Sequence, residues 1–259
     1  MIFSADPMIV FRYDRTFDGL LTVVFDAYSR RRFPERLIGP GEPEPLFAQE
    51  VFDSPTDPAR AARVWKGLQR KLPRRGCNML VHAWLSETEG ADELLLRCIR
   101  KVFDSPGPKA GDFSDPDVLA VHKLARTVSH EAHHLIQFAR LRKMADGSYY
   151  APVAPKYNAL PLAVSYFRDR FADQRWLIYD RRRGYGYCYD LSEVHEVEFA
   201  AEADAPPEVL ADGLLDPDER LFQQLWKGYF DALAITERRN PRLQRQQMPV
   251  RFWKYLTEK

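Results

Sequence analysis

Residues 119–142 read LAVHKLARTVSHEAHHLIQFARLR, with apolar side chains at helical spacing. At about 100° per residue, positions i, i+3, i+4 and i+7 share one helix face. That face holds Val121, Leu124, Ala125, Val128, Ala132, Leu135, Ile136 and Ala139. On or near the opposite face are His122, Arg126, His130, His133 and Gln137, with Lys123 and His134 beside them. The stretch predicts a long helix with one packed face, opened by Asp115-Pro116.

The residues before this motif helix predict one early strand, a second short strand and several helices. Strands are expected over 8–14 and 48–54, and helices over 16–32, 57–72 and, in two pieces, within 76–103. Thr16 and Asp57 stand where helix N-caps are expected, and Pro58 follows Asp57 at a first-turn position.

The residues after the motif helix predict hairpins and then helices. One hairpin turns at Asp146-Gly147, a second lies within 175–191, and an amphipathic helix covers 217–235. The fold class is α+β, with a helical first half that contains the long motif helix, antiparallel hairpins in the second half, and C-terminal helices. We expect a single domain over residues 1–259, in which 1–145 and 146–259 can form two lobes.

Composition is that of a globular protein, with 45% hydrophobic and 29% charged residues among 259. No run of about 18 apolar residues is present, and the first residues lack a basic region and cleavage site, so we expect a cytoplasmic protein with no membrane contact. Cys77, Cys98 and Cys188 are scattered, which predicts neither a disulfide framework nor a cysteine metal site.

Residues 130–134 (HEAHH) fit the zinc-hydrolase pattern His-Glu-x-x-His. His130 and His134 would hold the metal, and Glu131 would activate the bound water. A catalytic zinc needs a third protein ligand, and no patterned candidate follows in the sequence. Lys123 and Arg126 on the same face would also repel a cation. The sequence therefore favours an anion-binding or structural face with no cofactor, and a zinc hydrolase is the alternative.

The C-terminal stretch 237–256 (ERRNPRLQRQQMPVRFWKYL) interleaves arginines with aromatic and amide side chains. Such a mixture is typical of nucleic-acid binding, because cations neutralise phosphates and aromatic rings stack on bases. The predicted nucleic-acid contacts are His122, Lys123, Arg126, His130, Arg238, Arg239, Asn240, Arg242, Gln244, Arg245, Arg251 and Trp253. A solvated basic tail, anchored by Trp253 and Leu256, is the other interpretation.

Four stretches carry a resemblance to a known family: YDRTFDGLLTVVFDAY (13–28), VHKLARTVSHEAHHLIQFARL (121–141), YAPVAPKYNALP (150–161) and LWKGYFDALAITERRNPRLQRQQMPVRFWKYLTE (225–258). In this order they resemble a bacterial family of DNA-metabolism or DNA-repair proteins. The matching positions are Tyr13, Asp14, Gly19, His122, Lys123, Arg126, Glu131, His133, Arg238, Asn240, Pro241, Gln244 and Trp253.

The resemblance implies DNA as a partner, together with a radical-SAM repair protein and a uracil-DNA glycosylase-like protein, to which related domains are fused. The family's middle motif reads REAHR, with Arg where this chain has His130 and His134. Because Arg is no ordinary zinc ligand, the match favours Glu131 and His133 as the residues with a chemical role. His133 would move a proton, and Glu131 would orient it or act as a base. A protein-interaction scaffold without catalysis is a further hypothesis.

Overall fold

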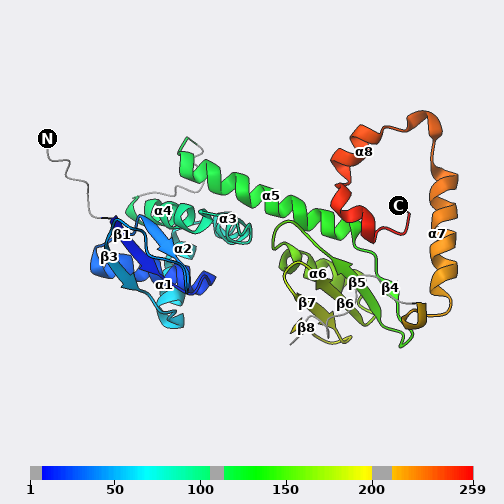
Figure 1. Ribbon diagram of the computed structural model, residues 1–259, viewed down its shortest axis with the longest axis horizontal. Coiled ribbons are helices and arrows are strands. Elements are labelled where there is room, and N and C mark those ends of the chain that lie inside the picture. Colours follow the sequence, from blue (N-terminus) through cyan, green and yellow to red (C-terminus); the bar gives the residue numbers. More distant parts are fainter. Residues whose placement is uncertain (1–7, 106–113, 200–211, 259) are drawn as a thin grey trace. The chain divides into compact units, whose positions relative to one another are not determined.

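The computed structural model describes residues 8–105, 114–199 and 212–258 (Figure 1). The chain forms two compact units, Met1–Val128 and Ser129–Lys259. The division falls within the motif helix α5 (Pro116–Phe138), whereas the sequence suggests a lobe boundary at residue 145. The acidic residues between 200 and 211 lie outside the described part of the chain.

The first unit contains a three-stranded sheet with the order β2-β1-β3. The strands are β1 (Met8–Arg12), β2 (Arg36–Ile38) and β3 (Ala48–Asp53). Both outer strands run parallel to β1, although the hairpins in the sequence favour antiparallel pairing. Parallel neighbours need a crossover, and α1 (Phe17–Arg30) supplies the one from β1 to β2.

Helices pack around the core of this unit. They are α1, α2 (Pro58–Lys71), α3 (Arg74–Trp84), α4 (Ala91–Asp104) and the first part of α5. The predicted caps are confirmed: the Thr16 hydroxyl accepts the Gly19 N–H at 2.9 Å, and Asp57 accepts the N–H groups of two residues in α2. A Cβ at Gly19 would lie 2.2 Å from the Asp14 carboxylate, so the close turn before α1 requires glycine.

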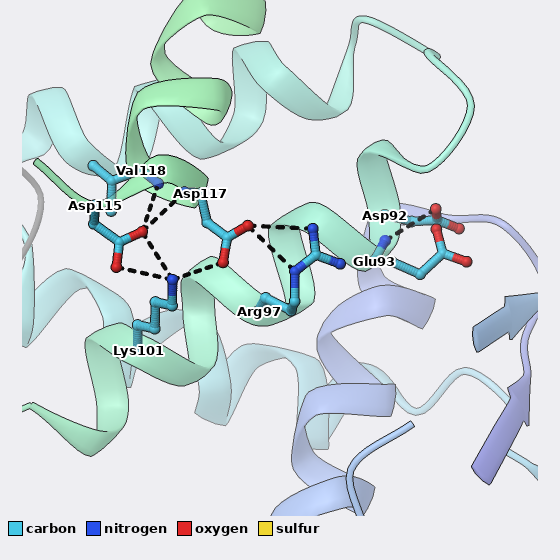
Figure 2. A network of polar contacts seen from close by, with 7 residues as sticks. All are labelled: Asp92, Glu93, Arg97, Lys101, Asp115, Asp117 and Val118. Atoms are coloured by element: carbon cyan, nitrogen blue, oxygen red, sulfur yellow. Dashed lines mark hydrogen bonds and ion pairs between the residues drawn. The ribbon is translucent and has the colours of Figure 1, made fainter. Parts of the chain in front are cut away.

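A charged clamp joins the start of α5 to α4 (Figure 2). Lys101 Nζ lies 2.8 Å from both carboxylate oxygens of Asp115 and 2.7 Å from Asp117. Arg97 holds the other oxygen of Asp117 at 3.2 Å. Asp115 also accepts the Val118 N–H at 3.2 Å, which makes it the cap of the motif helix.

The second unit contains a five-stranded sheet with the order β4-β5-β6-β7-β8. Its strands are β4 (Arg142–Lys143), β5 (Tyr149–Val153), β6 (Trp176–Asp180), β7 (Tyr185–Tyr189) and β8 (Val194–Glu198). The two predicted hairpins, β4–β5 and β6–β7, are antiparallel. Strands β5 and β6 are parallel and are connected through α6 (Leu160–Arg170). With mixed helices and strands, the α+β prediction is confirmed.

The chain ends in helical segments: η1 (Asp212–Leu214), α7 (Glu219–Leu233), η2 (Thr236–Arg238), α8 (Pro241–Gln247) and η3 (Val250–Tyr255). Phe252 and Tyr255 of segment η3 are buried. The centroid of the Phe252 ring lies 5.5 Å from that of the Phe138 ring in α5. Helix α7 is amphipathic as predicted, yet most of its large apolar side chains are exposed. No helix among the described residues is long and apolar enough to cross a membrane.

Candidate nucleic-acid interface

Glu131, the central residue of the HEAHH motif, is a buried ion-pair partner. Its side chain is 3% exposed. Arg251 of η3 donates from Nε to Oε1 at 3.1 Å and from Nη2 to Oε2. The Lys156 N–H donates to Oε1 at 2.6 Å. Charge-assisted bonds of this kind are stronger than neutral ones, so Glu131 fastens two distant segments of the second unit to α5.

Arginines of the β6–β7 turn bind the carbonyl groups of the same short segment whose Lys156 N–H donates to Glu131. Arg183 pairs with the fully buried Asp180 at 2.9 Å and donates to the Pro155 carbonyl at 3.2 Å. Arg182 donates to the Lys156 carbonyl at 3.0 Å. Burial raises the pKa of Asp180, and the charge of Arg183 opposes that rise. These arginines therefore support the fold around the motif.

His133, the second residue expected to have a chemical role, is exposed, and its Nε2 lies 3.0 Å from Gln137 Nε2. A general base must have a lone pair available to its substrate. Both carboxylate oxygens of Glu131 already accept hydrogen bonds from protein groups. A catalytic role for Glu131 and His133 stays a prediction.

The outer histidines of the motif, His130 and His134, lie with their ring centroids 5.6 Å apart and their planes nearly perpendicular. His134 stacks on Phe138, and burial lowers its pKa. Within the described ranges, no three His, Cys, Asp or Glu side chains are grouped to hold a metal ion. Zinc binding by these histidines also stays a prediction.

The predicted contacts on α5 are divided between the two units. His122, Lys123 and Arg126 belong to the first unit, where Lys123 and Arg126 are exposed. His130 belongs to the second unit and is exposed. From the sequence we also expect the motif helix and the C-terminal segment to form one cationic groove, and this stays a prediction.

The C-terminal basic segment, defined as residues 238–245, presents four exposed arginines: Arg238, Arg239, Arg242 and Arg245. None of their guanidinium groups makes an ion pair with another residue that the structure describes. Asn240 caps α8, since its side chain accepts the Leu243 N–H at 3.0 Å. Arg251 differs from these four because Glu131 engages it. Trp253 is partly buried, and its indole N–H donates to the Met248 carbonyl at 3.0 Å.

A cavity of about 840 Å³ lies between the end of α7, η2 and α8. Four of the predicted contacts line this C-terminal cavity: Arg238, Arg239, Asn240 and Gln244. Apolar lining comes from Phe230, Leu233, Ile235 and Leu243, and carboxylates come from Asp231 and Glu258. Glu258 is engaged by Arg140 at 2.7 Å and by Trp226 at 2.9 Å. The cavity thus combines cationic, amide and apolar surface.

Residues 89–258 match the family described as a domain of unknown function, DUF4130. The chain belongs to the DUF4130 family. The matched region includes α4, α5 and the whole described part of the second unit, and so contains both the HEAHH motif and the C-terminal basic segment.

Other comparisons add little to the DUF4130 assignment. No curated protein matches the chain. Among solved structures, a pGpG-specific phosphodiesterase, PggH from Vibrio cholerae, is similar at 11% identity over 70% of this chain and 80% of that chain, with a TM-score of 0.31. A likeness of this degree carries no inference about fold or activity.

Sequence reasoning on this DUF4130 chain missed the role of Arg251 and the C-terminal cavity. Arg251 was grouped with the nucleic-acid contacts because it lies in a basic stretch. The signal in the sequence was the aromatic residue next to it, Phe252, which the structure buries. The cavity had no sequence signal, because it depends on how α7 and α8 pack.

Proposed function

We propose that this protein binds nucleic acid through its C-terminal basic segment. The observation that supports this is the set of four exposed arginines without ion-pair partners among the described residues. A free guanidinium group binds phosphate in a bidentate manner and releases the counterions condensed on the nucleic acid. Glu237 is the one acidic residue within 235–250. The segment is therefore a local concentration of positive charge.

Other arginines of the second unit contrast with this segment. Arg140, Arg183 and Arg251 each lie within hydrogen-bond distance of a carboxylate whose side chain is at most 3% exposed. Such residues offer little to a ligand, because a buried carboxylate already neutralises their charge. The distinction supports a binding role for the unpaired arginines and leaves Arg251 out of the proposed interface.

The biological setting that we propose is DNA repair, with a radical-SAM protein as a partner. This part rests on the family resemblance of the sequence and on one structural feature. Helix α7 exposes apolar side chains, among them Phe222 at 61%, Leu225 at 58% and Tyr229 at 58%. An exposed apolar face of this kind is typical of a protein contact. The same face supports the second candidate function, a scaffold that binds only a protein.

Binding of labelled DNA to the purified chain, followed by fluorescence anisotropy at low salt, tests the proposal. Single-stranded, duplex and uracil-containing DNA are compared. We expect R238Q/R239Q and R242Q/R245Q each to weaken binding, whereas R168Q/R170Q on α6 removes the same charge and leaves it unchanged. Absence of binding by the unaltered protein to all three DNAs would refute the proposal and favour the scaffold.

A further inference from the structure

A second concentration of positive charge lies in the first unit, outside the region matched by the family. Residues 58–86 contain no Asp or Glu. Their cations are Arg60, Arg63, Lys66, Arg70, Lys71, Arg74 and Arg75. These residues form α2 and α3. A stretch of this length without any acid is a local positive field even though the whole chain has a net charge of +1.

Two of these cations serve the fold. Arg60 pairs with Asp26 at 2.8 Å and with Asp57 at 3.1 Å. Lys71 donates to carbonyls at the end of α4, of which that of Phe103 is the nearest at 2.7 Å. Both side chains are therefore engaged within the unit.

The remaining five cations are exposed and have no hydrogen-bond or ion-pair partner among the described residues. We call Arg63, Lys66, Arg70, Arg74 and Arg75 the basic ridge. The α2 members stand at i, i+3 and i+7, which places them on one helix face. The buried residues of α2, Ala61, Val64 and Leu68, stand on another face. Helical periodicity therefore places the apolar residues of α2 in the core and its ridge residues in solvent.

The start of α3 adds a second observation. Its first turn carries Arg74 and Arg75, and its N-cap, Pro73, provides no side-chain cap hydrogen bond. Positive charges at a helix N-terminus are unfavourable, because the helix dipole is positive there. An anion bound at this position would neutralise the two guanidinium groups that lie beside the positive end of the helix.

We propose that the basic ridge binds the phosphate backbone of nucleic acid, as a site separate from the C-terminal basic segment. The choice of ligand rests on the proposed function. The chemistry of the ridge favours a polyanion over a single phosphate, because its five cations are spread along two helices. The contact is with the backbone and carries no sequence preference.

The experiment measures DNA affinity of the full chain at several salt concentrations. The ridge variant is R70Q/R74Q/R75Q. The matched control is R32Q/R97Q/R100Q in the same unit, whose three arginines already face carboxylates at 3.8, 3.2 and 3.4 Å. For duplex DNA we expect the slope of log K against log salt to fall by about 2.7 in the ridge variant, since each phosphate contact contributes about 0.9. We expect no change in the slope for the control.

The outcomes separate the two proposals. A slope that falls in the ridge variant and returns in R70K/R74K/R75K supports the ridge, since lysine keeps the charge. An unchanged slope in the ridge variant, together with a reduced one in R238Q/R239Q, overturns the ridge alone. No DNA binding by the unaltered chain overturns the proposed function and the ridge with it. Urea denaturation of each variant checks that the fold is retained.

Discussion

The guanidinium group of Arg251 and the carboxylate of Glu131, 120 positions apart in the sequence, form a bidentate ion pair in which the Glu131 side chain is buried. This pair fastens η3 to α5, and the Lys156 N–H joins it from a third segment. The residue that a zinc-hydrolase motif would use to activate water is here a structural anchor. The pairing gives the HEAHH motif a role that requires no metal.

Breaking this pair is expected to destabilise the protein. E131Q keeps the size of the side chain and leaves the Arg251 charge without its partner. The Arg251 side chain is 37% exposed, so water can solvate its charge once the partner is gone. We therefore expect the free energy of unfolding of E131Q to fall by about 2 kcal/mol, which is the cost of hydrogen bonds to a charged group and less than that of breaking a fully buried pair. Urea denaturation measures it, with the exposed E193Q as control. In a double-mutant cycle with R251Q, additive effects of the two changes would show that the pair contributes nothing.

Metal content distinguishes the anchor from a catalytic centre. Because Arg251 and Lys156 engage the Glu131 carboxylate, we expect the purified protein to contain no stoichiometric zinc and H130A to leave its metal content unchanged. Elemental analysis by mass spectrometry of the protein, prepared without chelators, provides the measurement. One zinc per chain that disappears in H130A would restore the zinc-hydrolase hypothesis.

The pH dependence of stability is expected to include a contribution from Glu93. Burial raises the pKa of this carboxyl, and the neighbouring Asp92 raises it further. A carboxyl with a raised pKa contributes stability below its unfolded value of about 4.3 and loses it as pH rises through the folded value. The difference in free energy of unfolding between E93Q and the unaltered protein should therefore grow in favour of E93Q from pH 4 to pH 8. The exposed E89Q should show no such trend.

The C-terminal cavity is expected to prefer single-stranded DNA. Leu243 lines it and is 49% exposed, so a base that is free of pairing can bury part of its apolar face against the leucine side chain. We expect L243S to weaken binding of single-stranded DNA several-fold and to leave duplex binding unchanged, in the anisotropy assay used for the arginine variants. L221S, on α7 and outside the cavity lining, serves as the control. Equal loss for both forms of DNA would argue against base contact.

Local signals in the sequence predicted most helices and hairpins. Contacts between residues far apart in the sequence could not be predicted from it. Thr16 and Asp57 identified helix starts because a cap depends on neighbouring residues, and Gly147, with φ of 78°, marked a hairpin turn. The parallel sheet was missed because β2 has three residues and too few side chains to show a pattern. The Arg251 partner lies too far along the chain for any spacing rule. The cations of the basic ridge are present in the sequence, but their pattern predicts only a helix and gives no binding site.

Hydrogen–deuterium exchange of the full chain, with and without DNA, tests the central claim most directly, because it reports where the ligand contacts the backbone. The account predicts slower exchange on DNA addition in peptides covering residues 238–247, while peptides covering α6, residues 160–170, stay unchanged. Protection confined to other parts of the chain, with residues 238–247 unaffected at saturating DNA, would contradict it.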